Sequence, residues 1–243
     1  MIKRLFDLSV SLIFIIVFSP LLLFFSFLIW KQDWHSPFYV APRVGKKGKI
    51  FKMIKFRSMI VDADKSGVDS TSANDSRITS LGSLIRKYKI DELPNFFNIA
   101  KGDMSFVGPR PNVKRETDLY TNEEKLLLSV RPGITDLASI VFSDEGDILE
   151  NSIDPDLDYN QLIRPWKSRL GIFYVNNRSI WMDIKLMFLT GLAILSKKLA
   201  LKGVNKILTK KSANKDLIKI SLRADHLKPF PPPGSDCIVI SRG

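Results

Sequence analysis

The distribution of apolar residues divides the chain into an uncharged N-terminal run and a longer mixed region. No charged residue occurs at positions 8–30, a length that allows a helix to cross a bilayer. Ser19-Pro20 interrupts the middle of this run, where proline removes a backbone hydrogen bond and bends a helix. The Ser19 hydroxyl can satisfy the carbonyl that is freed. We therefore predict a helix over residues 1–34 that is broken at Ser19-Pro20.

Basic residues flank the apolar run on both sides. Lys3 and Arg4 precede it, and Lys31, Arg43 and Lys46 are among the basic residues that follow. Because Lys and Arg favour the cytoplasmic side of a membrane, a re-entrant helix that enters and leaves by the same face satisfies both flanks. A straight, Pro-kinked span satisfies only one, and the residues alone leave both topologies open.

The periodicity of residues 35–202 predicts an α+β domain that is mostly helical. A short β-hairpin is expected from residues 38–40 and 50–56 around a turn at residues 45–48. Apolar spacing predicts helices over residues 80–89, 114–130, 159–170 and 180–199. The uncharged centre of the last helix is too short to span a bilayer, and it suits an amphipathic interfacial helix or packing on the domain equally.

Three segments are expected to lack helices. Residues 66–76 are polar and rich in turn formers, and residues 131–135 fit a turn. Residues 144–158 are acidic and are predicted to form a solvated loop. Residues 203–243 form a basic, Pro-rich extension in which residues 236–241 could add one strand.

The net charge of +12 indicates an anionic partner, which could be nucleic acid, a phosphorylated substrate or an anionic membrane. Cys237 is the only cysteine, so no disulfide can form within the chain. With only two histidines, this composition excludes a zinc site of the usual spacing.

Asp91 and Glu92 are the candidate catalytic and metal-binding residues. They precede Leu93-Pro94, and proline is tolerated in the first turn of a helix, so Asp91 is expected to be the N-cap of a helix that follows. Adjacent helical residues do not face one another, so we expect the two carboxylates to point in different directions. The alternative is that both simply cap the helix and favour its positive end.

Basic residues surround this acidic pair in the sequence. Carboxylates in a basic field suit a polyphosphate site that works through a divalent cation or by attack on phosphorus. Pro109 and Pro111 restrict the backbone on both sides of Arg110, although an ordinary rigid turn is the alternative. The predicted phosphate-binding residues are Lys55, Arg57, Arg77, Arg86, Pro109, Arg110 and Pro111.

In order and spacing, several short motifs from Lys3 to about Leu195 resemble those of the bacterial sugar transferases, the monotopic phosphoglycosyl transferases. The matching motifs are Lys3-Arg4-Leu5-Phe6-Asp7, Ser19-Pro20, Arg43-Val44-Gly45 with Gly48-Lys49, Lys55-Phe56-Arg57-Ser58-Met59, Asp75-Ser76-Arg77-Ile78-Thr79, Asp91-Glu92-Leu93-Pro94, Gly102-Asp103-Met104-Ser105, Gly108-Pro109-Arg110-Pro111 and Arg131-Pro132-Gly133-Ile134-Thr135.

This resemblance implies a re-entrant membrane helix over residues 1–34, a small cytoplasmic catalytic domain over residues 35–202, and the extension over residues 203–243 outside the family pattern. It places the chain at the inner (cytoplasmic) membrane of a bacterium, with Lys3, Arg4, Ser19 and Pro20 at the membrane. The expected partners are a UDP-sugar, a polyprenol phosphate and lipid headgroups, with no nucleic acid; a homodimer is left open.

The resemblance also implies a reaction. A phospho-sugar would pass from the UDP-sugar to undecaprenyl phosphate with Mg²⁺ as cofactor, in the first membrane step of glycan assembly. By similarity, Asp91 is the nucleophile that forms a covalent phosphosugar intermediate and releases UMP. Asp91 is expected to lie at the lipid surface. Glu92 would be a metal ligand or general base, and Arg110 would hold phosphate or nucleotide.

Two other functions remain open on the residues alone. One is a membrane-bound, metal-dependent phosphodiesterase or nucleotidyl transferase that uses Asp91 and Glu92 only as metal ligands. The other is a non-enzymatic module that binds anionic lipid or nucleic acid through its net charge. Such a module would tolerate Asp91→Asn.

Overall fold

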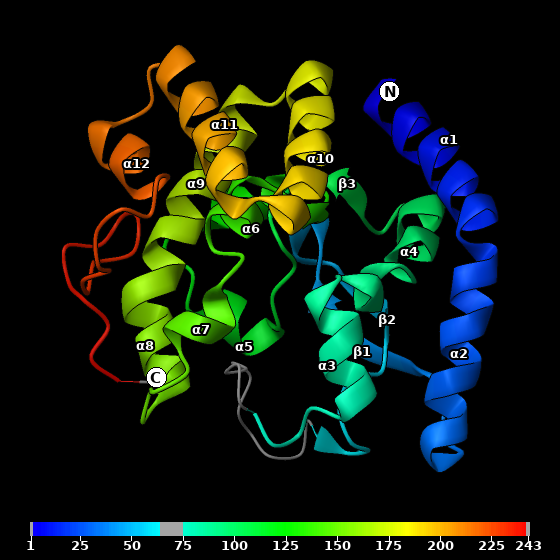
Figure 1. Ribbon diagram of the computed structural model, residues 1–243. Coiled ribbons are helices and arrows are strands. Elements are labelled where there is room, and N and C mark those ends of the chain that lie inside the picture. The colour runs from blue at the N-terminus through cyan, green and yellow to red at the C-terminus, as the bar shows by residue number, and fades with distance from the viewer. Residues whose placement is uncertain (1, 64–74, 242–243) are drawn as a thin grey trace.

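Two helices at the N-terminus form a bent arm along one side of the molecule (Figure 1). In the computed structural model, which describes residues 2–63 and 75–241, α1 spans Ile2–Val17 and α2 spans Ser19–Asp33, and the pair is bent by 62°. Pro20 lies in the first turn of α2, and the Ser19 hydroxyl donates a hydrogen bond to the Ile16 carbonyl at 2.8 Å. The predicted break at Ser19-Pro20 is confirmed.

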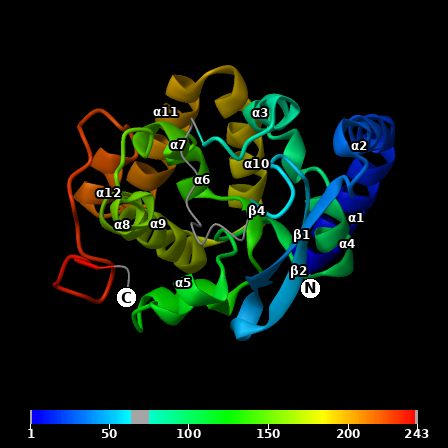
Figure 2. The same ribbon diagram turned by 90° about the horizontal axis from the view of Figure 1, so that it is seen from below.

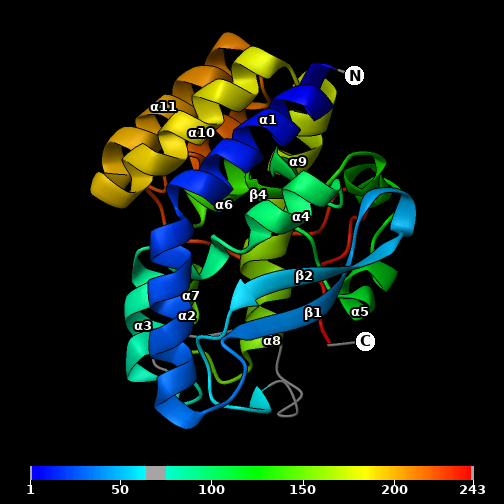
Figure 3. The ribbon, with the colours of Figure 1, turned by 90° about the vertical axis from the view of Figure 1, so that its right-hand side faces the viewer.

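The length and composition of these helices bear on membrane insertion. Within the described ranges, no helix taken singly has both the length and the apolar character needed to cross a bilayer. The bent pair α1 and α2 meets that requirement only when its two arms are counted together. Figure 3 shows α1, α2, α10 (Ile180–Leu195) and α11 (Lys197–Lys210) on the same side of the molecule.

Polar contacts hold α1 against the rest of the chain. Lys3 Nζ lies 2.5 Å from a carboxylate oxygen of Asp183 on α10. The Arg4 guanidinium donates hydrogen bonds to the carbonyls of Ile99 and Ala100, at 2.6 and 2.7 Å. These carbonyls belong to the last turn of α4 (Asn95–Lys101), the end of a helix that attracts cations. Lys3 and Arg4, predicted at the membrane, therefore attach the N-terminal arm to the domain.

The predicted β-hairpin is confirmed. β1 (Phe38–Val44) pairs antiparallel with β2 (Ile50–Phe56), and Phe38 lies opposite Phe56 in the register. The turn between them includes a short 3₁₀ segment, Lys46–Gly48. Figure 2 shows the hairpin lying beside α5 (Lys114–Asp118) at the edge of the molecule. The end of β2 carries Lys55 towards the candidate site.

The segment around the acidic pair differs from the prediction in one respect. The helix expected over residues 80–89 is present as α3 (Ser80–Lys87). Asp91 does not cap the next helix, because it lies inside a separate 3₁₀ turn, Ile90–Glu92, and α4 follows Pro94 without any side-chain cap. Since Leu93 and Pro94 themselves have helical backbone angles, the turn runs on into α4 and leaves the Asp91 carboxylate free for other contacts.

The turn expected at residues 131–135 is instead partly a strand. β4 (Gly133–Thr135) pairs parallel with β3 (Ser105–Val107), the second two-stranded sheet of the described residues. The turn prediction failed because Gly108 and Gly133 let the two backbone segments approach more closely than any residue with a Cβ atom would allow. A Cβ atom on Gly133 would lie 2.2 Å from the Gly108 nitrogen, and one on Gly108 would lie 2.4 Å from the Arg131 carbonyl oxygen.

The single helix expected over residues 114–130 is also wrong. The chain forms α5 and then, after a break, a 3₁₀ helix at Glu124–Ser129. The break has a local cause, because Thr121 and Glu124 form reciprocal capping hydrogen bonds, each 3.1 Å long, that start a new helical segment.

The C-terminal half is more helical than predicted. The helix expected over residues 159–170 is confirmed and extends further, as a π-helical turn Tyr159–Ile163 that leads into α9 (Arg164–Asn177). Residues 144–158, predicted as a solvated loop, form α7 (Glu145–Ile148) and α8 (Pro155–Asp158) around a fully buried Leu149. That apolar anchor ties the acidic segment to the core.

The predicted extension is integrated into the domain. α11 continues through residue 203 and buries Val204 and Leu208 fully, and α12 (Lys215–Ile220) packs beside it. The strand suggested for residues 236–241 is not formed in the described part of this segment. Instead the tail runs along α8 and α9, on the side of the molecule opposite α1 and α2 (Figures 1 and 2), and Phe230 stacks on Trp166 at 4.5 Å.

The main core joins β2, β3, α4 and the short helix α6 (Leu137–Val141) to α9, α10 and α11. A smaller cluster connects α2 to α3 through residues such as Phe25, Phe56 and Ile85. The two faces of α10 differ in exposure, because Leu186 is fully buried on one and Phe188 is exposed on the other.

Candidate active site

Asp91 and Glu92 both lie beside Lys55. Lys55 Nζ is 3.2 Å from Glu92 Oε1 and 4.0 Å from Asp91 Oδ2. A second cation approaches Glu92 alone, because Arg110 Nη2 lies 2.8 Å from the same Oε1 atom. The two carboxylates thus share one ammonium group, while only Glu92 holds a guanidinium. The 3₁₀ turn Ile90–Glu92, the end of β2 and the loop that follows β3 supply this cluster.

The Asp91 carboxylate is the less satisfied of the pair. Its side chain is only 12% exposed, and Oδ1 is buried without a hydrogen-bond partner among the described residues. Burial raises the pKa of Asp91, and the charge of Lys55 opposes that rise. This side chain is more enclosed than the aspartate at the lipid surface that the resemblance implies. It is a carboxylate with one oxygen left for a ligand.

The Glu92 carboxylate is held in the ionised form. Burial alone would raise its pKa, but the charges of Arg110 and Lys55 outweigh burial and hold the pKa well below its usual range. Conversely, burial lowers the pKa of Lys55 against the opposing pull of Glu92. The neighbouring carboxylates therefore have opposite pKa shifts, which is the pattern expected when two acids serve different purposes.

The structure brings some of the predicted basic residues to the pair and leaves others away from it. Arg86 lies near enough to Asp91 to lower its pKa slightly. Arg57 instead forms two hydrogen bonds with Asp33 at the end of α2, at 2.5 and 2.6 Å. Arg77 is engaged with Asp75 at 2.6 Å. Of the predicted basic residues, Lys55, Arg86 and Arg110 thus reach the site. The charge of Lys89, outside the predicted set, also opposes the rise in the pKa of Asp91 and helps to lower that of Glu92.

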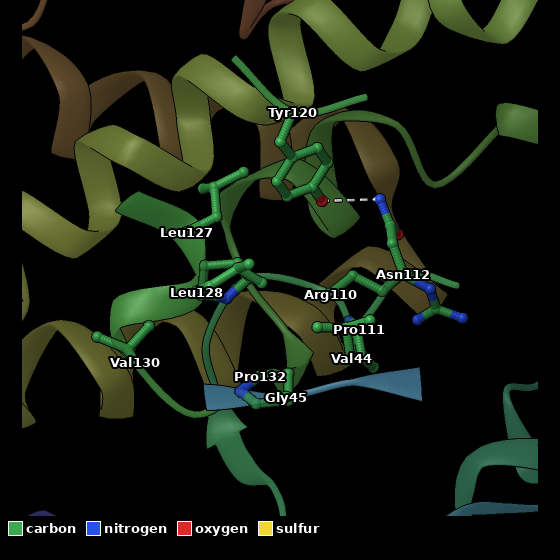
Figure 4. Close-up of a pocket in the computed structure, with 11 residues that line it drawn as sticks. Val44, Gly45, Arg110, Pro111, Asn112, Tyr120, Leu127, Leu128, Val130 and Pro132 are labelled. Atoms are coloured by element: carbon green, nitrogen blue, oxygen red, sulfur yellow. Dashed lines mark hydrogen bonds between the residues drawn. The ribbon is translucent and has the colours of Figure 1, made fainter. Parts of the chain in front are cut away.

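Pro109 and Pro111 flank Arg110 as the sequence indicates. Both line a very small cavity of about 10 Å³, which has room for one water-sized group and none for a nucleotide. Figure 4 shows this cavity, where the Asn112 amide donates a 3.0 Å hydrogen bond to the Tyr120 hydroxyl. The two prolines thus belong to a rigid wall that carries Arg110.

Sequence reasoning missed a second charged pair beyond Arg110. Glu145 of α7 lies 2.6 Å from Lys167 of α9. The charge of Glu145 raises the pKa of Arg110, and the charge of Arg110 in turn acts to lower the pKa of Lys167. The charge of Lys167 outweighs burial and lowers the pKa of Glu145. The residues are 22 positions apart on different helices, so no local motif joins them. The sequence pattern predicts a solvated loop for the acidic segment that contains Glu145, and so gives no sign of this pair.

Comparisons with known proteins identify a family for most of the chain. A family model described as "Bacterial sugar transferase" matches residues 1–197. The chain belongs to the bacterial sugar transferase family. Its motifs around Lys55, Asp91, Glu92 and Arg110 all fall within the matched residues, so the charged cluster belongs to the family domain.

Over the aligned regions, individual relatives are about one-third identical to this sugar transferase domain. It is 35% identical over 198 residues to the UDP-N-acetylgalactosamine-undecaprenyl-phosphate N-acetylgalactosaminephosphotransferase of Aeromonas hydrophila, a match that covers 80% of this chain and 44% of the relative. It is 34% identical over 208 residues to the undecaprenyl-phosphate galactose phosphotransferase of Salmonella typhimurium, covering 79% of this chain and 40% of the relative.

A third relative matches half of the chain at a higher identity. The putative undecaprenyl-phosphate N-acetylgalactosaminyl 1-phosphate transferase of Bacillus subtilis is 44% identical over 122 residues, which is 50% of this chain and 68% of that protein. The chain spans less than half the length of the Aeromonas and Salmonella relatives.

The acidic pair can be tested as a site for Mg²⁺. Carboxylate oxygens are the donors that this ion prefers, and the unpaired Asp91 Oδ1 fits that requirement. Glu92 fits it less well, because its Oε1 atom already accepts from Arg110 and Lys55. Across residues 2–63 and 75–241, three or more acidic, His or Cys side chains never cluster as a metal site. Substrate phosphates and water would supply the remaining ligands, as is usual for Mg²⁺.

Proposed function

We propose that this domain transfers a sugar phosphate from a UDP-sugar to a polyprenol phosphate such as undecaprenyl phosphate. The observation that carries the proposal is the buried Asp91 carboxylate, whose Oδ1 has no partner among the described residues although Lys55 lies beside Oδ2. The Aeromonas and Salmonella relatives are named as undecaprenyl-phosphate sugar phosphotransferases, which supports the same substrates.

Asp91 would act as the nucleophile. In the first step a carboxylate oxygen attacks the phosphorus that carries the sugar, a new O–P bond forms, and the bond to the bridging oxygen breaks. UMP leaves with the electron pair. In the second step an oxygen of the polyprenol phosphate attacks that phosphorus, the aspartyl O–P bond breaks, and the Asp91 carboxylate is regenerated. The product is a polyprenyl diphosphate sugar.

The cations of the site would make this attack feasible. A carboxylate and a diphosphate repel each other until positive charge neutralises them. Arg110 and Lys55 would place a guanidinium and an ammonium beside the phosphates, and Arg86 would add a third charge near Asp91. Mg²⁺, when bound, would supply Lewis-acid neutralisation of the diphosphate. Glu92, fixed by two cations, would orient them rather than take part in covalent chemistry.

The decisive experiment measures UMP release and a covalent intermediate separately. The full chain in nanodiscs is incubated with UDP-galactose, UDP-glucose or UDP-N-acetylgalactosamine and Mg²⁺, with and without undecaprenyl phosphate. One donor should give a stoichiometric burst of UMP without acceptor and a protein mass increase of one phosphosugar on Asp91. Turnover should require the acceptor.

Two variants complete this test. Asp91→Asn should abolish the burst, whereas Asp118→Asn, which changes an exposed aspartate of α5, should retain it. Sustained UMP release without acceptor or adduct would indicate a phosphodiesterase or nucleotidyl transferase instead. Full activity in Asp91→Asn would refute the proposed nucleophile.

We further propose that the bent pair α1 and α2 is a re-entrant membrane segment at the cytoplasmic face of the bacterial inner membrane. The 62° bend and the exposed apolar side chains on both arms, such as Leu12, Ile16 and Phe24, support this topology. In a Cys237→Ser background, single cysteines at Ile2 and Lys31 should both react with an impermeant maleimide from the cytoplasmic side only. Labelling of the two positions from opposite sides would show a spanning helix.

A further inference from the structure

A second cavity lies away from the acidic pair, between the start of α11 and the turn that follows α12. Its volume is about 480 Å³, and it is lined by Asp144, Lys197, Lys198, Leu201, Lys202, Leu222 and Arg223. Four of these side chains are cations and one is an anion, so the lining carries a charge of +3. Five of the seven lining residues lie beyond residue 197, outside the family match, and two of these five lie beyond residue 203.

Arg223 is held in this lining with unused donors. Its Nη2 atom lies 3.4 Å from Asp144 Oδ2, and its guanidinium packs over the Phe142 ring at 5.0 Å. Nε and Nη1 are buried and have no hydrogen-bond partner among the described residues. Because a buried donor without a partner costs free energy, a guanidinium in this state favours an acceptor from outside the chain.

Asp144 leaves an acceptor in the same place. Its Oδ2 atom forms ion pairs with Lys197 Nζ, at 2.5 Å, and with Arg223 Nη2. Its Oδ1 atom is buried without a partner among the described residues. The cavity therefore offers several cationic donors for an anion and one carboxylate oxygen for a hydroxyl. A phosphate ester that also carries a hydroxyl group matches both requirements.

Apolar side chains border the cationic lining. Leu222 lines the cavity and is 43% exposed, and Leu201 of α11 lines it as well. A cationic cavity with an apolar border suits a lipid, whose phosphate enters while its acyl chains stay outside. A soluble phosphate ester would gain nothing from these leucines.

We propose that this cavity binds the headgroup of an anionic phospholipid that carries a free hydroxyl, such as phosphatidylglycerol. The phosphate is held by Arg223 and the lysines of α11, and the headgroup hydroxyl donates to Asp144 Oδ1. The cavity is separate from the transfer site, and the two are linked along the chain because Asp144 precedes Glu145, whose charge acts on Arg110. Lipid bound here would hold α7 and α11 against the membrane surface.

The test uses the full chain in a zwitterionic detergent and follows its thermal unfolding. Short-chain phosphatidylglycerol should raise the Tm in a saturable manner, and short-chain phosphatidylcholine and glycerol 3-phosphate should not. The double variant Lys198→Gln, Lys202→Gln should raise the apparent Kd for phosphatidylglycerol about 10- to 100-fold, because two charged donors are removed. Both lysines are exposed, so this variant should fold normally.

Arg223→Gln should have the same effect on lipid binding, and Lys206→Gln, an exposed lysine of α11 outside the lining, should have none. An equal response to phosphatidylcholine or to glycerol 3-phosphate would overturn the proposal, as would an unchanged Kd in the double lysine variant. Asp91→Asn should bind lipid normally, so failure of the transfer mechanism and failure of this site give different results.

Discussion

Arg110 Nη2 lies 2.8 Å from Glu92 Oε1, although the two residues are 18 positions apart in the chain. Lys55 reaches the same oxygen from β2 at 3.2 Å. These two cations hold Glu92 ionised and fixed, while the adjacent Asp91 keeps an unpaired buried oxygen. The neighbouring acids therefore differ in availability, and this difference leads to the first two predictions.

Replacing Asp91 with asparagine should stabilise the fold at neutral pH by about 1 kcal/mol. Burial raises the pKa of Asp91 above the model-compound value of 3.8. The folded chain then binds the proton more tightly than the unfolded chain, so stability falls as pH rises from the unfolded pKa through the folded one. Asparagine, which never ionises, avoids this loss.

Denaturation of wild type and Asp91→Asn between pH 4 and pH 8 checks this prediction. The two stabilities should converge towards pH 4 and separate as the pH rises. A variant that is less stable than wild type at pH 7 would mean that the ionised carboxylate is already compensated within the fold.

Replacing Arg110 with glutamine should lower kcat/KM about 10²- to 10³-fold, because a donor aimed at developing phosphate charge is lost. The fold should lose only about 1 kcal/mol, since the Arg110 side chain is 37% exposed and solvent screens the pair. The pKa of Glu92 should rise towards its usual range, which moves the acidic limb of the pH–rate profile upward. Arg110→Lys should keep the pH profile but recover little activity, because lysine lacks the planar fork.

The contact between Asp33 and Arg57 should stabilise the docking of α2 in a pH-dependent manner. Hydrogen bonds from Arg57 lower the pKa of Asp33 to about 2 from 3.8. A depressed carboxyl pKa contributes stability above the unfolded value of 3.8, and this contribution is lost as pH falls towards 2. Asp33→Asn should therefore cost about 1 kcal/mol at pH 7 and almost nothing near pH 2. Thermal unfolding at both pH values measures the difference; a constant cost would exclude the ion pair as its source.

Gly133→Ala should prevent folding or destabilise the chain by more than about 3 kcal/mol. The added Cβ would lie 2.2 Å from the Gly108 nitrogen, so β3 and β4 would have to separate. Gly191→Ala is the matched control, because a Cβ there meets nothing within 4 Å on the exposed side of α10. It should stabilise the helix by about 0.5–1 kcal/mol. Similar expression and Tm for the two variants would contradict this account of the parallel strands.

Local patterns were sufficient for several elements of this protein. The Ser19-Pro20 break follows from the missing proline donor, and the observed bond from Ser19 to the Ile16 carbonyl is the compensation that this chemistry requires. The hairpin and α3 also follow from short-range alternation and capping, because their stabilising contacts are close in sequence. The acidic pair was likewise identified by its composition and its basic surroundings.

Tertiary structure decided which charges meet. The sequence placed Arg57 and Arg77 among the phosphate ligands on equal terms with Lys55, yet Asp33 and Asp75 engage them elsewhere. Conversely, Glu145 and Lys167 join the wall of the site from helices that no motif connects. Coulomb energies depend on the distance and burial of partners, and both are set by packing between distant segments.

By itself, the sequence determined the elements whose causes are local: the bent apolar arm, the basic flanks, the hairpin and the presence of an acidic pair in a cationic region. Only the tertiary structure decided that Glu92 is occupied while Asp91 is available, and that residues beyond 203 line a second cationic cavity. The physical reason is that a carboxylate is available to a ligand only if the fold brings no partner within a few ångströms of it. The separation of two residues along the chain does not determine that distance.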